Sequence, residues 1–184
     1  MMSGDHGVDS SVPAAINSLK LYDDLCLILV GDESQITELI SDKIKNEYIN
    51  RYSIVHTKEF ITMNDEVIKA IRSKKKSSMR LAINSVKDED ASACVSAGNT
   101  GALMALSKII LKMIPGIDRP AICGALPTKN GQCYMLDLGA NVECDSNHLY
   151  QFSIMGSALV QSLVINTKPV VGLLNIGSED FKGN

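Results

Sequence analysis

The stretch LCLILVGDESQITELISDKIKNEYINRYSIVH (residues 25–56) decides the fold, because its hydrophobic period changes from that of a strand to that of a helix and back. Residues 25–30 form a continuous apolar run that ends at Gly31-Asp32, which is typical of a buried strand. Apolar residues then recur at helical spacing, so one helix is predicted over residues 34–48 and a short strand over residues 53–55. The residues at helical spacing are Ile36, Leu39, Ile40 and Ile44.

The rest of the chain continues this alternation. A hairpin is predicted where two apolar runs are joined by Lys129-Asn130-Gly131, and a long helix is predicted to follow an N-cap at Asp145 or Ser146. Further helices are predicted at residues 65–73, 78–86, 101–113 and 147–164, and further strands at residues 92–96, 122–126, 133–138 and 170–174. The predicted fold class is α/β, a three-layer α/β/α sandwich with a mostly parallel, Rossmann-like sheet.

Both ends of the sequence look abrupt. It opens on the turn SGDHG (residues 3–7) with no strand before it, and it closes on a loop with no helix to cover the last predicted strand. Parallel strands need a crossover to their neighbours, and an uncovered edge strand is a liability. We therefore expect a single domain over residues 1–184 that is incomplete at both ends.

The composition favours a globular protein and argues against nucleic-acid-binding, membrane-spanning and disulfide-rich classes. Of the 184 residues, 45% are hydrophobic and 21% are charged, which is typical of a globular chain. The formal net charge of −3 gives no basic excess for nucleic acid. No stretch reaches the roughly 18 apolar residues of a membrane span, and the first residues do not form a signal peptide, so we expect a cytoplasmic protein. The five cysteines are too scattered to predict a disulfide framework or a metal site.

Three loops that follow predicted strands combine glycine with asparagine. They are SAGNTG (residues 96–101), DLGAN (residues 137–141) and NIG (residues 175–177). Glycine lets the backbone approach a ligand, and asparagine both donates and accepts hydrogen bonds. Ligands of open α/β sheets bind beyond the carboxyl ends of strands, and the first loop opens a helix without early acidic residues, so the loops predict a site for a phosphate-type anion. The simpler interpretation, that Asn99 and Thr100 only cap the helix, stays open.

Cations and nucleophiles are sparse near these loops. Arg119, Lys182 and His6 are candidates for offsetting the charge of an anion. The basic run at residues 72–80 is either a solvated connection, which we favour, or a docking patch for an acidic partner. Cys144 is the least improbable nucleophile, but no general base lies near it in the sequence, so an inert thiol is favoured. The glycine motifs of α/β-hydrolases, P-loops and dinucleotide-binding folds are absent.

Several longer strings resemble those of one family, the bacterial phosphate acyltransferases, and they run in family order over nearly all of the chain. The most specific are SAGNTGALMA (residues 96–105) and LDLGANV (residues 136–142), and others are LILVGDE, PGIDRPAI and LPTKNG. The chain departs from the family pattern at Ser3 and Val8, where the family has glycine and proline. Family members are much longer, so the resemblance covers only the N-terminal half of their domain.

The resemblance implies an enzyme that forms acyl phosphate from acyl-acyl carrier protein and inorganic phosphate, which feeds phospholipid (phosphatidic acid) synthesis. It also implies a fold similar to those of phosphate acetyltransferase and isocitrate dehydrogenase. Phosphate is then the nucleophile, and no cofactor or metal is expected. Loop position and motif match together suggest His6, Asp137 and Lys182 as catalytic residues, and Ser96, Asn99, Thr100, Gly101, Gly139, Asn141, Asn175 and Gly177 as binding residues for phosphate or the acyl group.

The resemblance extends to partners and location. It implies a homodimer in full-length relatives and peripheral association with the membrane, with a membrane glycerol-3-phosphate acyltransferase as a candidate partner. Two alternatives stay open at this point. One is a phosphate acetyl- or butyryltransferase that uses a coenzyme A thioester, and the other is a catalytically inactive truncated fragment.

Overall fold

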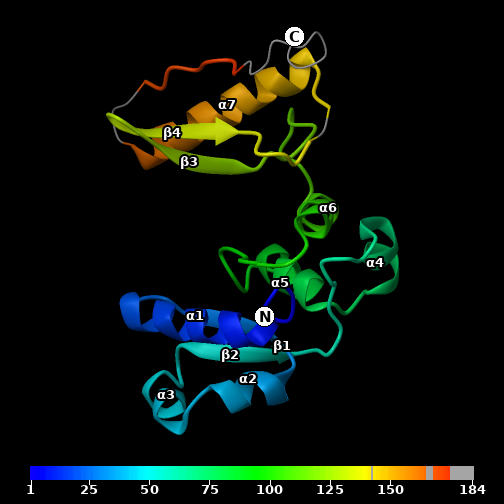
Figure 1. Cartoon of the computed structure of the whole chain (residues 1–184), viewed down its shortest axis with the longest axis vertical. Coiled ribbons are helices and arrows are strands. Elements are labelled where there is room, and N and C mark those ends of the chain that lie inside the picture. The colour runs from blue at the N-terminus through cyan, green and yellow to red at the C-terminus, as the bar shows by residue number, and fades with distance from the viewer. Residues whose placement is uncertain (142, 165–167, 175–184) are drawn as a thin grey trace. The chain divides into compact units, whose positions relative to one another are not determined.

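A computed structural model of the chain describes residues 1–141, 143–164 and 168–174. The fold is mixed α/β and divides into two compact units, Met1–Lys112 and Met113–Asn184 (Figure 1). The helices are α1 (Gly7–Leu21), α2 (Glu33–Leu39), α3 (Asp42–Glu47), α4 (Val67–Ser73), α5 (Ser78–Lys87), α6 (Thr100–Ile110) and α7 (Ser146–Leu163), and the strands are β1 (Leu27–Gly31), β2 (Tyr52–His56), β3 (Cys123–Thr128) and β4 (Gly131–Leu136). The expectation of one domain over the whole chain stays a prediction.

The first unit contains the predicted parallel pair. Strands β1 and β2 run in the same direction, with Leu27 opposite Tyr52 and Gly31 opposite His56, and the connection through α2 and α3 is the crossover that parallel strands need. Apolar side chains from α1, β1 and α2 share one buried cluster, so these elements form a single core. Its buried members are Val12, Ile16, Leu29, Ile36 and Ile40.

A second buried cluster lies between α4, α5 and α6. On α6, Ala102, Leu106 and Ile110 recur every four residues and form one stripe, which meets Met79 and Ile83 of α5. Ile61 and Ala70 complete the cluster. Because α6 is packed along its whole length, the position of its first turn is fixed.

The second unit consists of the predicted hairpin and the long helix. Strands β3 and β4 are antiparallel, and Thr128 pairs with Gly131 across the turn. Helix α7 begins with a capping box, in which the Asp145 carboxylate accepts from the His148 backbone N–H (2.9 Å) and the His148 ring nitrogen accepts from the Asp145 N–H (3.2 Å). Of the two predicted N-caps, Asp145 is the correct one.

Helix predictions needed two corrections. The single helix predicted over residues 34–48 is wrong, because the backbone is extended at Ile40 and Ser41 and a new helix begins at Asp42. This break keeps Ile36 and Ile40 buried while Leu39 turns toward solvent. Helix α1 was not predicted at all, although Val12, Ile16 and Leu19 recur at helical spacing on its buried face.

Two predicted strands are also wrong. Residues 92–96 and 170–174 are not in a strand, and no strand among the described residues pairs with them. Val95 and Val170 are each 97% exposed. Local β-propensity marks these segments, but a strand exists only where a neighbour accepts its hydrogen bonds.

Candidate functional site

The loop at residues 96–101 forms a compact turn that opens helix α6. The Ser96 hydroxyl accepts from the Gly98 N–H (3.2 Å), and the Asn99 carbonyl side-chain oxygen caps the helix by accepting from the Ala102 N–H (3.0 Å). The Thr100 and Gly101 N–H groups precede the first intrahelical hydrogen bond, so they have no carbonyl partner within the helix. Both residues are exposed, and the first turn of α6 carries no acidic residue.

Asn99 also ties this loop to a distant part of the chain. Its side-chain NH2 group donates to the carbonyl of Met63 (3.0 Å) and, more weakly, to that of Thr62 (3.4 Å). The amide is therefore used fully in holding the loop. Asn99 therefore caps α6, and its direct contact with an anion stays a prediction.

The N-terminal turn at residues 3–7 packs against the loop at residues 96–101. Gly4 has a φ of +100°, and a Cβ added there would lie 2.9 Å from the carbonyl oxygen of Ala97. A Cβ added at Gly98 would collide with the Ser3 hydroxyl. The two segments approach each other this closely because Gly4 and Gly98 carry no side chain where each meets the other segment.

His6 lies in the same N-terminal turn and occupies the N-cap position of α1, where its side chain makes no capping hydrogen bond. It is exposed and lines an open hollow of about 690 Å³ with Asp5, Asp9, Gln35 and Phe60. The structure therefore places His6 in the segment that contacts the loop at residues 96–101, while its catalytic role stays a prediction.

In the second unit, the loop at residues 137–141 is organised by the Asp137 carboxylate. Its two oxygens accept from the backbone N–H groups of Ile122 (2.9 Å), Ala140 (3.2 Å) and Asn141 (2.7 Å). The Asn141 side-chain NH2 group donates to Asp137 (2.9 Å) and to the Pro120 carbonyl (2.9 Å). Gly139, with a φ of +87°, lets the chain turn back so that these N–H groups meet the carboxylate.

These contacts set the charge state of Asp137. Burial by itself raises the pKa of the carboxyl, but the hydrogen bonds from Ile122, Asn141 and Ala140 outweigh it, so the net effect lowers the pKa. Asp137 therefore stays ionised at neutral pH and acts as an acceptor for its own loop. The geometry is consistent with a positioning role for Asp137, which holds the Asn141 amide. Contact of Asn141 with a ligand stays a prediction.

Arg119 is held beside this loop. Its guanidinium donates to the Glu143 carbonyl (3.0 Å). The preceding residue, Asp118, is clamped by Gln151 of α7, which accepts from the Asp118 N–H (2.8 Å) and donates to its carboxylate (2.6 Å). The segment at residues 118–122 is therefore fixed to both α7 and the Asp137 loop.

The predicted site residues fall into three groups. His6, Ser96, Asn99, Thr100 and Gly101 belong to the first unit, where the structure brings their two segments together, and Asp137, Gly139 and Asn141 form one loop of the second unit. Asn175, Gly177 and Lys182 lie outside the described residues. A common hollow shared by all three loops stays a prediction.

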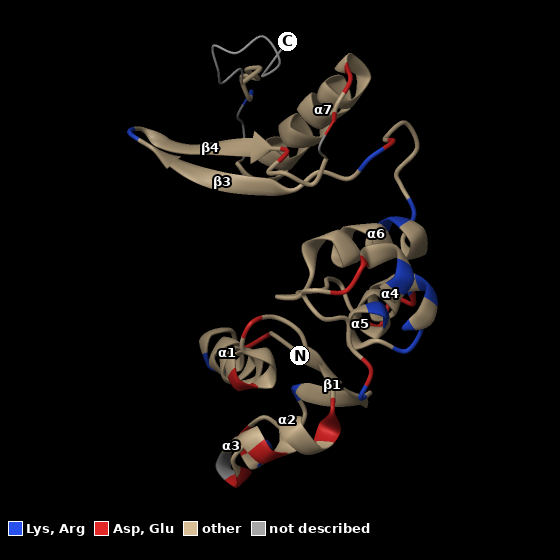
Figure 2. Ribbon diagram, turned by 45° about the vertical axis from the view of Figure 1, so that its right-hand side comes forward, with Lys and Arg blue, Asp and Glu red and all other residues tan. Residues whose placement is uncertain are grey.

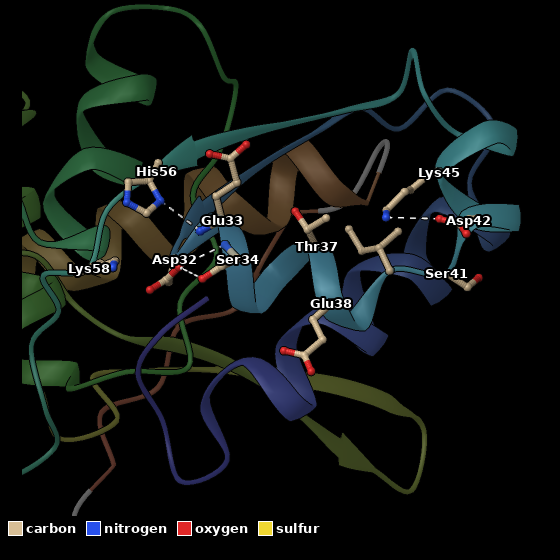
Figure 3. A pocket seen from close by; sticks show the side chains of 11 residues that line it. Asp32, Glu33, Ser34, Thr37, Glu38, Ser41, Asp42, Lys45, His56 and Lys58 are labelled. Carbon is tan, nitrogen blue, oxygen red and sulfur yellow. Dashed lines mark hydrogen bonds and ion pairs between the residues drawn. The ribbon is translucent and has the colours of Figure 1, made fainter.

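Sequence reasoning missed an open hollow of about 910 Å³ at the carboxyl ends of β1 and β2 (Figure 3). Asp32, which caps α2, and His56, which accepts from the Glu33 N–H (3.1 Å), line it together with Lys58. Their positions directly after two strands were the available signal. The hydrogen bond from the Ser34 hydroxyl lowers the pKa of Asp32. Four carboxylates around this hollow oppose an anionic ligand, and they belong to Asp32, Glu33, Glu38 and Asp42.

The basic run at residues 72–80 is partly paired. Figure 2 shows lysine and arginine gathered on α4 and near the start of α5. Lys74 pairs with Asp65 at 2.5 Å, and Arg80 donates to the Ile71 carbonyl (2.7 Å). Lys75 and Lys76 are exposed, so these two side chains are accessible to a partner.

All five cysteines are free, and Cys26, Cys123, Cys133 and Cys144 are exposed. The described residues hold no group of three or more His, Cys, Asp or Glu side chains arranged for a metal ion. Every helix in the described part of the chain is too short or too polar to cross a membrane.

Comparisons with known proteins find similarity over the whole chain. The model of the family described as "Fatty acid synthesis protein" matches residues 1–184. The chain is 53% identical over 183 residues to a phosphate acyltransferase of Methylococcus capsulatus and 52% identical over 184 residues to one of Hydrogenovibrio crunogenus, each time with 100% of this chain and 54% of the relative covered. A phosphate acyltransferase of a Janthinobacterium species is 55% identical over 185 residues, with 51% of that protein covered. The chain thus spans about half the length of the curated relatives it matches.

Proposed function

Because this chain belongs to the fatty acid synthesis protein family, we propose that it is part of a phosphate acyltransferase that forms acyl phosphate for phospholipid synthesis. The names of the relatives at about half identity support the reaction class. The proposal extends to the donor, acyl-acyl carrier protein, and to inorganic phosphate as the acceptor.

The proposed chemistry is a displacement at a thioester. A phosphate oxygen attacks the carbonyl carbon, a C–O bond forms, the C–S bond breaks, and sulfur leaves with the bonding electrons as a thiolate. A thiol with a pKa of about 8.5 leaves without strong acid help. The protein then has to position two anionic substrates and stabilise the oxyanion that forms at the carbonyl.

The observation that carries the proposal is the apposition of the N-terminal turn and the loop at the start of α6. The N–H groups of Thr100 and Gly101, which are exposed residues, stand at the positive end of an 11-residue helix without acidic residues in its first turn, which favours an anion. His6 belongs to the segment packed against this loop. In this proposal Asn99 positions these groups and His6 offsets charge.

The loop at residues 137–141 has the second role. The Asp137 carboxylate fixes the backbone of this loop by accepting from the Ala140 and Asn141 N–H groups and from the Asn141 amide. The loop is proposed to place its remaining polar groups beside the acyl carbonyl or phosphate. An ionised Asp137 would repel phosphate at close range, which is why we assign it to positioning and not to general base catalysis. Asn175, Gly177 and Lys182 are proposed to complete the site.

The donor is proposed to be a carrier protein because of the exposed lysines in the turn between α4 and α5. Lys75 and Lys76 are accessible to an acidic protein surface and can attract it at long range. A homodimer, a cytoplasmic location with peripheral association with the membrane, and a membrane glycerol-3-phosphate acyltransferase as partner belong to the same proposal.

A donor comparison tests the function. The purified chain is incubated with phosphate and either a long-chain acyl-acyl carrier protein, the matching acyl-coenzyme A or butyryl-coenzyme A, and acyl phosphate is trapped with hydroxylamine. We expect phosphate-dependent hydroxamate from the carrier thioester. Product from butyryl-coenzyme A alone would favour the short-chain alternative, and no product from any donor would favour the inactive fragment.

Two variants at one position test the phosphate site. Asn99→Asp and Asn99→Ser both keep a cap acceptor for Ala102 and both lose the amide donors to Met63, and the carboxylate charge is the difference between them that bears on anion binding. If the α6 start binds phosphate, the Asp variant raises the KM for phosphate about tenfold above that of the Ser variant. Equal KM values in the two variants would contradict the site.

A further inference from the structure

The second unit buries very little apolar surface. Among its described residues, Phe152 is the one apolar side chain in the fully buried class, whereas both buried clusters lie in the first unit. Large apolar side chains of the second unit are instead exposed, and they include Ile114, Tyr150, Ile154, Leu163, Leu173 and Leu174. A hairpin with one helix and so small a core is marginal by itself.

Helix α7 shows where the missing contact belongs. Gly156 faces β4, since a Cβ added there would lie 3.2 Å from Leu136, and Phe152 lies one turn earlier on the same side. Tyr150 and Ile154 are four residues apart on the opposite side and are 64% and 46% exposed. One side of the helix therefore packs on the hairpin, and the other presents a stripe that nothing in the described part of the second unit covers.

The composition of α7 argues that this stripe is normally covered. The helix has 18 residues and contains no Asp, Glu, Lys or Arg. A surface helix carries charged or polar residues on the face opposite its packed side, and the exposed Tyr150 and Ile154 on the outer side of α7 depart from that pattern. An exposed apolar patch of this kind marks a contact with another polypeptide.

We propose that the Tyr150–Ile154 stripe of α7 docks the part of a phosphate acyltransferase polypeptide that this chain does not span. In three relatives the matched part covers only 51–54% of the protein, so the unmatched part is nearly as long as this chain. That unmatched part is the polypeptide that we propose as the occupant of the stripe. This inference rests on family membership and on packing, and it does not depend on the proposed reaction.

Co-expression tests the docking surface. The tagged chain of 184 residues is expressed together with the unmatched part of the Methylococcus capsulatus phosphate acyltransferase, and the complex is recovered on the tag and weighed by sedimentation velocity. We expect an equimolar complex. Ile154→Glu lowers the amount of retained partner at least about tenfold, because a carboxylate is then buried in an apolar contact.

Controls separate docking from folding. Ile68→Glu on α4 changes a residue that is 61% exposed in the first unit and leaves retention unchanged. Tyr150→Lys repeats the test with the opposite charge, and melting curves of each variant alone verify that folding is intact. Absence of the complex, or retention unaffected by both α7 variants, overturns the proposal, as does a homodimer of the chain that these variants break. A complex that forms but makes no acyl phosphate leaves this inference intact and contradicts the proposed function.

Discussion

Asp137 shows how one side chain fixes a candidate binding loop. Its carboxylate collects hydrogen bonds from the Ile122, Ala140 and Asn141 backbones and from the Asn141 amide. Each bond favours the ionised form, so the folded pKa is lowered against the opposing effect of burial. The shape of the loop is thereby linked to the charge of a single residue.

The loop should lose its order in acid. Because the folded pKa of Asp137 is lowered, its stabilising effect is complete above the ordinary aspartate pKa of about 3.9 and is lost as pH falls through the lower folded value. We expect the amide proton shifts of Ala140 and Asn141 to titrate together in NMR spectra, with a midpoint below about pH 3.9. Asp137→Asn should abolish this titration, and a midpoint above that value would contradict the assignment.

Contact between the two glycine-containing segments gives a second prediction for single residues. Gly98→Ala places a Cβ against the Ser3 hydroxyl, so we expect the free energy of unfolding to fall by about 1–3 kcal/mol. Adding Ser3→Gly removes the obstructing hydroxyl and should restore a large part of the loss. Urea denaturation of the wild type, the two single variants and the double variant measures the coupling. Additive effects would show that Ser3 and Gly98 do not meet in solution.

Among the helices, α7 owes its start to a capping box rather than to composition. The Asp145 carboxylate satisfies the His148 N–H, which would otherwise lack a partner. That hydrogen bond is the largest cause that lowers the pKa of Asp145. Tyr150 and Ile154 of the proposed docking stripe follow Asp145 on the same helix, so the cap also helps to hold the stripe in place.

Removing the cap should therefore fray the helix. Asp145→Ala should cost about 1 kcal/mol, whereas Asp145→Asn keeps an acceptor and should cost a few tenths at most. Hydrogen exchange at the amides of the first turn, measured by NMR, distinguishes the two variants. Equal protection in both would show that the first turn is held by packing and not by the cap.

Elements whose signals are local could be predicted from the sequence. Strand β1 follows from a continuous apolar run, the hairpin from Lys129-Asn130-Gly131, and the start of α7 from Asp145, because each signal lies within a few residues of the structure it specifies. Strands expected around Val95 and Val170 failed because a strand depends on a partner elsewhere in the chain. The break between α2 and α3 was not predicted, because the adjacent apolar residues Leu39 and Ile40 fit the pattern of one continuous helix as well as that of two helices.

In the candidate site, too, local features could be predicted from the sequence and long-range contacts could not. Asn99 and Asp137 could be selected from their loops, and the capping role of Asn99 was one of two interpretations left open. Its bonds to the Thr62 and Met63 carbonyls, 37 and 36 residues away in sequence, could not be foreseen. The hollow beside His56 was missed because its residues come from three separate elements and carry no motif.

For the molecule as a whole, stability is distributed unevenly. Both buried clusters belong to the first unit, so residues 1–112 hold most of the apolar burial that opposes unfolding. The second unit depends more on the hydrogen bonds of Asp137 and Gln151.

A shortened chain tests this distribution. Residues 1–112 expressed alone should unfold cooperatively, with a melting temperature close to that of the first unit in the whole chain. Leu106→Ala, at a fully buried position of α6, should destabilise both chains equally, by about 2–5 kcal/mol. A shortened chain without a cooperative transition would show that the first unit is not stable on its own.

The accessible thiols described above affect every measurement of assembly. Cys26, Cys123, Cys133 and Cys144 lie on the surface of the described chain, and surface thiols of neighbouring molecules oxidise slowly to intermolecular disulfides. A covalent dimer formed in air during storage would sediment like a specific one. Samples therefore need a reductant throughout, and gels run with and without it will separate accidental cross-links from genuine association.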